Sequence, residues 1–301
     1  MTTALPDEAM ARATIGHEYA QESVRAGEHV RSRLTTLYDV PPGMTFAQYR
    51  ATVRFGDDAT VPAARDLTIE GVPVRTFTPN GPSRGDYLHL HGGGWCLGSH
   101  TMHDETLQQL ADRTELTVTS IGYRMAPEHR YPACLDDILA VARAVSERPG
   151  TGFLAIGGES AGAHLAALTV IQLPERLGRQ PFSAVSLNYG AYDLTAGLDR
   201  ALALLMPDAD TETRRAASPL LADLTAVPPA RFCIGTGDAL LAQTLSMQAR
   251  WREHAPTELD VFAGAAHAFT TIRSTAARVA KEREAEYLRR GRDASSTPRP
   301  T

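Results

Sequence analysis

The chain has 301 residues, of which 43% are hydrophobic and 22% are charged, and its formal net charge at pH 7 is −5. These values are ordinary for a globular protein, and a chain of this length buries enough surface to fold without disulfides or a structural metal. The charge is mild and no basic run occurs, so nucleic acid is not an expected partner. The N-terminus lacks the apolar core of a secretory signal, and no apolar stretch reaches the roughly 20 residues of a membrane span. We therefore expect a cytoplasmic protein that does not bind membranes.

The three cysteines, Cys96, Cys134 and Cys233, are widely spaced in the sequence. They form no CxxC pair and no Cys/His cluster, which argues against a disulfide framework or a zinc site. The sequence also lacks the GKS, GKT and GxGxxG motifs of phosphate and dinucleotide sites. We expect reduced thiols, no metal and no cofactor.

Apolar spacing predicts one or two short helices between His17 and Tyr38, outside the main sheet, and the breaker Pro41-Pro42-Gly43 ends them. From Leu67 to Phe77 the residues alternate as in strands, and the break at Gly71 predicts a hairpin. Strand and helix patterns then alternate. The predicted strands are Asp86–Leu90, Leu116–Ile121, Phe153–Gly157, Ala184–Asn188, Arg231–Gly235 and Glu258–Phe262. The predicted helices are His103–Arg113, Pro132–Glu147, Ala161–Leu173, Leu240–His254 and Ala277–Arg290.

This alternation predicts an α/β fold, with a mostly parallel central sheet flanked by helices on both faces. The stretch Leu194–Pro229 has helix-like pieces between two strands and predicts an insertion over the edge of the sheet. The polar segment Arg292–Thr301 predicts a disordered tail.

The motif Gly158-Glu159-Ser160-Ala161-Gly162 follows a predicted apolar strand and precedes an apolar helix. A serine on such a tight turn projects its hydroxyl from the end of the sheet, and the small flanking residues avoid collisions with the neighbouring strand and helix. In isolation GxSxG also fits an ordinary Gly/Ser turn. The strand–turn–helix context favours Ser160 as a nucleophile.

A second motif, His91-Gly92-Gly93-Gly94-Trp95, follows the predicted strand Asp86–Leu90. Consecutive glycines let backbone N–H groups approach a substrate oxygen closely, as an oxyanion hole requires. Glycine-rich turns also bind phosphate, but no accompanying phosphate motif is present. The position upstream of the serine turn favours the oxyanion hole.

A base is expected downstream of the serine, where the sequence offers His164, His254 and His267. His164 lies one turn into the helix after Ser160, and His254 ends a polar helix. His267 follows a strand within a loop of small residues, from which an imidazole reaches the serine. We predict His267 as the base.

The orienting acid is predicted to be Asp238, which follows the strand Arg231–Gly235 at its carboxyl end, where α/β sites gather. Asp260 lies within a strand and Asp223 in a loop, so both are weaker candidates. Asp238 also fits the N-cap of the following helix. That role is compatible with catalysis if its carboxylate faces His267.

With these residues in view, the sequence resembles the hormone-sensitive-lipase-like (bacterial family IV) carboxylesterases of the α/β-hydrolase superfamily. The resemblance extends from about Leu88 to Phe269 in the order of that family. The matching segments are His91-Gly-Gly-Gly-Trp95, Tyr123-Arg-Met-Ala-Pro-Glu-His-Arg-Tyr-Pro-Ala133, Gly158-Glu-Ser-Ala-Gly162, the Asp238 segment and His267-Ala-Phe269.

The resemblance implies an α/β-hydrolase fold with a helical cap. Residues 1–60 would form the first cap segment, 61–193 the first part of the core, 194–229 the cap insertion, 230–291 the rest of the core and 292–301 the tail. Ser160, Asp238 and His267 would form a catalytic triad. The oxyanion hole would consist of N–H groups from Gly92, Gly93, Gly94 and Ala161. Trp95 and Phe269 are candidates for contact with substrate, although Trp95 fits core packing equally well.

Four positions depart from the pattern of that family. Glu159 stands where Asp is commoner, Gly122 where an acidic residue often precedes Tyr-Arg, Ala242 where a second Asp often follows the catalytic one, and Ala268 where Gly is usual. None of these changes removes a reacting group, so activity is expected.

The expected function is a serine carboxylesterase or acetyl-ester hydrolase that acts on small acyl esters through an acyl-enzyme intermediate. An amidase of arylformamidase type is an alternative, because the glycine loop also fits its HGGxW motif. A non-catalytic ligand receptor on the same scaffold is a third hypothesis, which the presence of His267 opposes. The expected partner is a small-molecule ester, and a homodimer stays open.

Overall fold

The predicted strands assemble into one mixed sheet in the computed structural model, which describes residues 14–53, 61–150 and 152–295. The strands of these residues are β1 (Thr14–Ile15), β2 (Arg65–Ile69), β3 (Val72–Phe77), β4 (Gly85–Leu90), β5 (Thr117–Ile121), β6 (Phe153–Glu159), β7 (Ala184–Asn188), β8 (Ala230–Gly235) and β9 (Thr257–Phe262). Their order across the sheet is β1-β9-β8-β7-β6-β4-β5-β3-β2. β3 is antiparallel to both of its neighbours and all other pairs are parallel, so the prediction of a mostly parallel sheet is confirmed.

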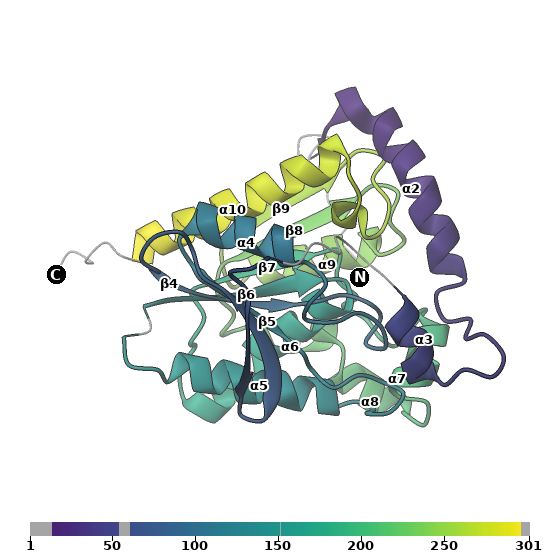
Figure 1. The fold of residues 1–301 in the computed structure, drawn as a ribbon, viewed down its shortest axis with the longest axis horizontal. Helices are drawn as coiled ribbons and strands as arrows, with labels where there is room; N and C mark the ends of the chain where they lie inside the picture. The colour runs from purple at the N-terminus through teal and green to yellow at the C-terminus, as the bar shows by residue number, and fades with distance from the viewer. Residues whose placement is uncertain (1–13, 54–60, 151, 296–301) are drawn as a thin grey trace.

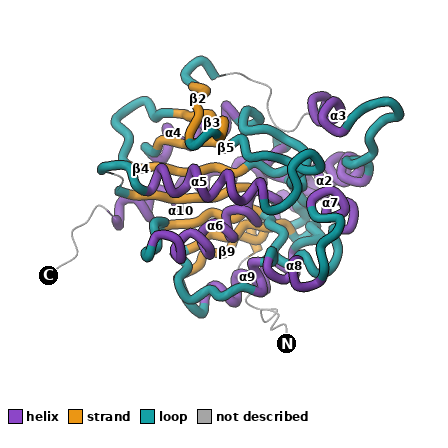
Figure 2. Tube along the Cα trace, turned by 90° about the horizontal axis from the view of Figure 1, so that it is seen from below, coloured by secondary structure: helices purple, strands orange, loops and turns teal. Residues whose placement is uncertain are grey.

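The helices flank this sheet on two sides (Figure 1). They are η1 (His17–Tyr19), α2 (Ala20–Thr35), α3 (Phe46–Thr52), α4 (Asp104–Thr114), α5 (Ala133–Ser146), α6 (Ala161–Leu177), α7 (Asp199–Leu205), α8 (Thr211–Ala216), η2 (Pro219–Leu221), α9 (Leu241–Arg252), η3 (Phe269–Thr271) and α10 (Thr275–Ser295). α4 and α10 lie on one face, whereas α5 and α6 lie across the strands on the other (Figure 2). No helix among the described residues combines the length and apolar character that crossing a membrane requires.

The central strand β6 shows why both faces are covered. Its successive side chains point to opposite faces, so Phe153 and Ala155 join the core under α4 and α10 while Leu154 and Ile156 join the larger core under α5 and α6. All four side chains are buried. A parallel strand buried on both faces becomes a continuous apolar run, which is how this segment is recognised in the sequence.

Most predicted elements are confirmed within one to four residues at each end, and the hairpin of β2 and β3 turns at Gly71 as expected. Three short elements were not predicted: β1, which pairs with β9, α3 and η3. Helix α10 continues through Ser295 and so includes residues that the sequence assigns to the tail. The remaining tail residues, 296–301, lie outside the described residues.

Helix α3 begins with a capping box, in which the Thr45 side chain accepts from the Gln48 N–H and the Gln48 side chain accepts from the Thr45 N–H. Arg50 connects this helix to the core through hydrogen bonds and an ion pair. Its guanidinium donates to the carbonyl oxygens of Cys96 at 2.5 Å and Ala126 at 2.7 Å, and it pairs with Glu128 at 2.6 Å. The N-terminal segment is therefore bonded to the loop that follows the glycine run.

The insertion between β7 and β8 carries α7, α8 and η2, and it meets α2 and α3 at one end of the molecule (Figures 1 and 2). Arg200 of α7 forms an ion pair with Asp39, which follows α2. Two segments far apart in the sequence thus lie together at this end.

A buried ion pair fastens α10 to the sheet. Arg231 of β8, whose side chain is 1% exposed, donates to Asp260 of β9 at 2.8 Å, and Arg283 of α10 donates to the other Asp260 oxygen at 2.6 Å. Arg231 also donates to the Asn188 side-chain oxygen and the Ala280 carbonyl. Charges this deep are tolerated because they are paired.

We predict that Asp260→Ala lowers the free energy of unfolding by about 3–5 kcal/mol, because it leaves the buried Arg231 charge without its carboxylate. Urea denaturation measures the loss. Glu258→Ala, on the same strand, is the matched control, since its pair with Arg290 is 45% exposed on both sides and its removal costs about 1 kcal/mol or less. Equal losses in the two variants would contradict this account of Asp260.

Candidate functional site

The turn at Ser160 joins β6 directly to α6 and forces an unusual backbone conformation. Ser160 has φ 53° and ψ −114°, a strained combination for a residue with a side chain. A methyl group at either Gly158 or Gly162 would overlap the Leu90 carbonyl at the end of β4. The turn is therefore as sharp as the GxSxG motif predicts, and it places the serine hydroxyl at the carboxyl end of the sheet.

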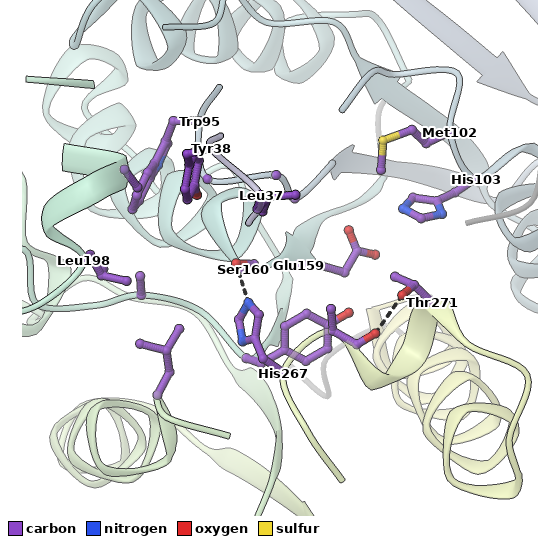
Figure 3. Close-up of a pocket in the computed structure, with 18 residues that line it drawn as sticks. Leu37, Tyr38, Trp95, Met102, His103, Glu159, Ser160, Leu198, His267 and Thr271 are labelled. Atoms are coloured by element: carbon purple, nitrogen blue, oxygen red, sulfur yellow. Dashed lines mark hydrogen bonds between the residues drawn. The ribbon is translucent and has the colours of Figure 1, made fainter. Parts of the chain in front are cut away.

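The structure brings Ser160, His267 and Asp238 into one hydrogen-bonded chain. Ser160 Oγ lies 2.9 Å from His267 Nε2 (Figure 3), and His267 Nδ1 lies 2.8 Å from Asp238 Oδ2. The three residues follow β6, β9 and β8, whose carboxyl ends meet at the same edge of the sheet. The Asp238 side chain is fully buried and that of His267 is 20% exposed. In this arrangement a buried acid orients an imidazole, and the imidazole is within reach of the proton of a hydroxyl that faces a cavity.

Asp238 lies just before α9 but is not its N-cap, which is Leu240. Asp238 Oδ1 accepts from the Leu240 N–H at 2.8 Å, just before α9 begins at Leu241. One carboxylate oxygen thus closes the turn that precedes α9 while the other faces His267. The N-cap interpretation is wrong, whereas the expected contact with His267 is present.

The competing histidines and acids lie elsewhere. His164 is fully buried and accepts from the Trp95 Nε1–H at 3.1 Å, while its Nε2 contacts the Ala217 carbonyl at 2.8 Å. Burial lowers the pKa of His164 to about 4, so it is neutral. His254 is exposed, Asp260 is occupied by two arginines and Asp223 caps a surface turn with Thr225.

The glycine loop lies directly beside the serine turn, as predicted. Gly93 has φ 117°, and a methyl group there would overlap the Leu97 carbonyl, so only glycine fits. Among the described residues, no acceptor receives the N–H groups of Gly93, Gly94 or Ala161. Gly92, Gly93 and Gly94 line the same cavity as Ser160. Free donors at a helix start and a glycine loop are suited to an anionic oxygen.

A cavity of about 200 Å³ opens above Ser160 and His267 (Figure 3). Side chains of two distant segments close it: Leu37 and Tyr38 follow α2, and Leu198 and Ala201 belong to the insertion. The sequence placed these segments above the site but did not identify the four residues, because local periodicity does not say which side chains enclose a cavity built from distant segments. The Tyr38 hydroxyl lies against Gly94, where a methyl group would overlap it.

The two predicted substrate contacts have different outcomes. Trp95 lines the cavity, but it is only 2% exposed and its indole bonds to His164, so it is both a wall and part of the core. The prediction for Phe269 is wrong. The left-handed backbone of Ala268 (φ 60°) turns Phe269 inward, where its ring packs on Phe262 and Tyr189 at centroid distances of 5.1 and 5.9 Å.

Glu159, the residue before the serine, has a role that the sequence did not indicate. Its carboxylate oxygens lie 3.0 and 3.1 Å from His89 Nε2 on the neighbouring strand β4. Burial opposes charge on both groups, but their mutual attraction outweighs it. The pKa of Glu159 is lowered to about 2 and that of His89 is raised. A charged carboxylate therefore lies beside the serine at one wall of the cavity.

Within residues 14–53, 61–150 and 152–295, no three His, Cys, Asp or Glu side chains gather in a way that suits a metal ion. The three cysteines are buried and unpaired with one another. Burial raises the pKa of Cys96, the thiol nearest the glycine loop, to about 12, which keeps it protonated.

Comparison with known families gives a match over the part of the chain that holds this site. A family model described as the α/β-hydrolase fold matches residues 87–271. Among curated proteins, the chain is 39% identical over 113 residues to versiconal hemiacetal acetate esterase of Emericella nidulans, and 36% identical over 129 residues to the esterase LipI of Mycobacterium tuberculosis. These matches cover 36% and 38% of this chain. The chain spans about two fifths of the length of either relative, 39% and 40% respectively.

Solved structures share the fold over more of the chain. A hormone-sensitive lipase from a metagenome library superposes with a TM-score of 0.75 at 23% identity, covering 89% of this chain and 98% of that one. The thermophilic carboxylesterase EstE1, cloned from a metagenomic library, gives 0.70 at 24% identity, covering 90% and 97%. At these identities the structures are evidence for the fold alone. The predicted α/β-hydrolase fold is confirmed.

We predict that His164→Leu lowers the free energy of unfolding by about 2–4 kcal/mol, because it leaves the Trp95 N–H and the Ala217 carbonyl buried without partners. Thermal or urea denaturation measures the change. His254→Leu replaces an exposed histidine and is expected to change stability by about 0.5 kcal/mol or less. A His164 variant as stable as the His254 variant would show that this buried bridge does not stabilise the fold.

Proposed function

Because the chain belongs to the α/β-hydrolase fold family, we propose that it is a serine carboxylesterase or acetyl-ester hydrolase acting on small acyl esters. The observation that carries the proposal is the hydrogen-bonded series Ser160–His267–Asp238, whose serine faces a cavity lined by the glycine loop. Among the described residues, no acceptor receives the N–H groups of Gly93 or Gly94. The esterase names of the curated relatives point in the same direction.

In this proposal His267 Nε2 takes the proton of Ser160 as Oγ attacks the ester carbonyl carbon. A serine hydroxyl is a weak nucleophile at neutral pH, so the 2.9 Å contact supplies the base it needs. Asp238 holds the imidazole with Nε2 toward the serine and stabilises the positive charge that develops on the ring. The buried carboxylate reaches no solvent that would weaken this interaction.

The carbonyl oxygen becomes an oxyanion as the tetrahedral intermediate forms. The backbone holds the N–H groups of Gly93, Gly94 and Ala161 in place before substrate binds, and these groups donate to no acceptor among the described residues. Each preorganised donor of this kind contributes about 2.7–4 kcal/mol to lowering the barrier. His267 then protonates the departing alcohol, which leaves an acyl group on Ser160. Water, activated by the same imidazole, releases the acid and restores the serine.

Residues 1–60, of which 1–13 and 54–60 lie outside the described residues, and residues 194–229 are proposed to act as the cap over this chemistry. Leu37, Tyr38, Leu198 and Ala201 contribute apolar walls to the cavity, which supports that division of the chain. Apolar walls exclude water and strengthen the hydrogen bonds within the site. The proposed substrate is a small molecule, and we propose that the enzyme works in the cytoplasm.

Two other functions remain alternatives. An amidase of arylformamidase type would use the same residues, so comparing a formyl amide with short acyl esters as substrates decides between them. A receptor on this scaffold would not need the complete chain of Ser160, His267 and Asp238, and it would fail to hydrolyse p-nitrophenyl acetate. The intact hydrogen-bonded chain favours the enzyme.

We predict that Ser160→Ala and His267→Ala each lower kcat for p-nitrophenyl acetate by about five to six orders of magnitude, since nucleophile and base act as a unit. Asp238→Asn is expected to lower it by about 10⁴-fold, because the imidazole loses its orienting charge. Initial-rate kinetics on the purified variants measures these effects.

Circular dichroism and thermal unfolding of the same variants separate lost chemistry from lost structure. The control is His254→Ala, which removes an exposed histidine and is expected to leave the rate unchanged. Near-normal turnover by His267→Ala would refute the assignment of the base.

A further inference from the structure

The cavity above Ser160 has two unlike sides (Figure 3). On one side of the serine lie the aromatic and aliphatic side chains of Trp95, Tyr38 and Leu198. These side chains offer a substrate mostly apolar contact. An acyl chain or other hydrocarbon group fits this side.

The opposite side is more polar. Glu159, His103 and Thr271 lie there, next to the Met102 thioether and across Ser160 from the apolar side chains named above (Figure 3). The Thr271 hydroxyl donates to the Ala268 carbonyl at 2.8 Å, so its oxygen presents lone pairs to other groups. Glu159 lies closest to the serine along the chain and brings a charge to this wall.

The protein supplies only part of the hydrogen bonds that the Glu159 carboxylate can accept. A carboxylate accepts about four hydrogen bonds, and His89 Nε2 supplies one N–H shared between the two oxygens. Among the described residues no second donor reaches it, and its side chain remains 18% exposed at the cavity. A role limited to holding β6 against β4 would not require this exposure.

The consequence depends on what fills the polar side. A substrate hydroxyl group on this side donates to the carboxylate, and this hydrogen bond replaces the one from the solvent that the substrate displaces. A hydrocarbon of the same size excludes solvent and leaves the carboxylate with the His89 N–H as its one donor among the described residues. A site built around a hydrogen bond rejects such an analogue far more strongly than a hydrophobic pocket rejects an extra methyl group.

We propose that Glu159 is a specificity-determining residue whose carboxylate accepts a hydrogen bond from a hydroxyl group on the alcohol half of the substrate. The preferred esters then combine a hydroxylated alcohol with a short apolar acyl chain. This inference rests on the proposed esterase function and identifies a substrate class for the same site.

Two pairs of substrates of equal size test the inference. In the first, 2-hydroxyethyl butyrate is compared with propyl butyrate, so that a hydroxyl replaces a methyl group on the alcohol half. In the second, propyl 3-hydroxybutanoate is compared with propyl 3-methylbutanoate, which moves the same exchange to the acyl half. The measured quantity is the ratio of kcat/KM within each pair, corrected by the ratio of the alkaline hydrolysis rates.

The wild-type enzyme is expected to favour the hydroxylated alcohol by about 10- to 100-fold. Glu159→Met keeps the length of the side chain but removes both acceptors, and its ratio is expected to fall to about 1. Glu159→Gln retains one acceptor without the charge, and its ratio is expected to lie between these values. Because both esters of a pair use the same serine, a general loss of activity in a variant cancels in the ratio.

The control is Leu198→Ala, which alters the apolar side of the cavity and is expected to preserve the ratio within about twofold even if activity falls.

Thermal unfolding shows whether each variant is folded. If neither Glu159 variant folds, the wild-type ratios still decide, because a ratio near 1 in both pairs overturns the inference. A preference confined to the acyl pair overturns the assignment to the alcohol half.

A wild-type preference that Glu159→Met retains shows that another group recognises the hydroxyl and also overturns the inference. Failure of the proposed function gives a different result, since the wild-type enzyme would then hydrolyse none of the four esters. Hydrolysis of propyl butyrate without discrimination leaves the esterase function in place and removes only the role of Glu159.

Discussion

The Leu90 carbonyl at the end of β4 lies against Gly158 and Gly162, the two glycines on either side of Ser160. The position of the glycine loop relative to the serine follows from this contact. A side chain at Gly158 or Gly162 would overlap that oxygen, so the end of β4 lies against the serine turn only because both positions are bare. The glycine loop begins at the next residue, His91. Because the loop continues directly from β4, the N–H groups of Gly93 and Gly94, which meet no acceptor among the described residues, lie beside Ser160. The base and acid reach the same point because β8 and β9 end at the same edge of the sheet.

The order of the strands positions Glu159 and the proposed triad, whereas part of the cavity wall is attached separately. Ser160, His267 and Asp238 follow parallel strands whose mutual positions are fixed by backbone hydrogen bonds and a buried core. The lining side chains that follow α2 or belong to the insertion instead come from segments outside the sheet, which are attached through side chains such as Arg50 and Arg200. Variation in these segments changes the shape of the cavity without moving the reacting groups, which is how one fold serves many substrates.

The sequence predicted the parts of the protein that depend on local pattern. Buried parallel strands are continuous apolar runs, and the serine turn has a motif dictated by backbone geometry, so both were found. The helix at Phe46–Thr52 was missed although Thr45 and Gln48 form a recognisable capping box. Phe269 was wrongly assigned to the pocket because its direction depends on the positive φ of Ala268, which periodicity does not reveal. The pair of Glu159 and His89 joins different strands, and only the sheet order brings them together.

The central claim is that Ser160 is the nucleophile activated by His267, and covalent labelling with diethyl p-nitrophenyl phosphate tests it most directly. The account predicts one diethyl phosphoryl group per chain, located by peptide mass spectrometry on the segment that contains Ser160, with p-nitrophenol released in equal amount. His267→Ala is predicted to react several orders of magnitude more slowly, because the hydroxyl then lacks its base. A stoichiometric label on any other residue, or equal labelling of Ser160→Ala, would contradict the account.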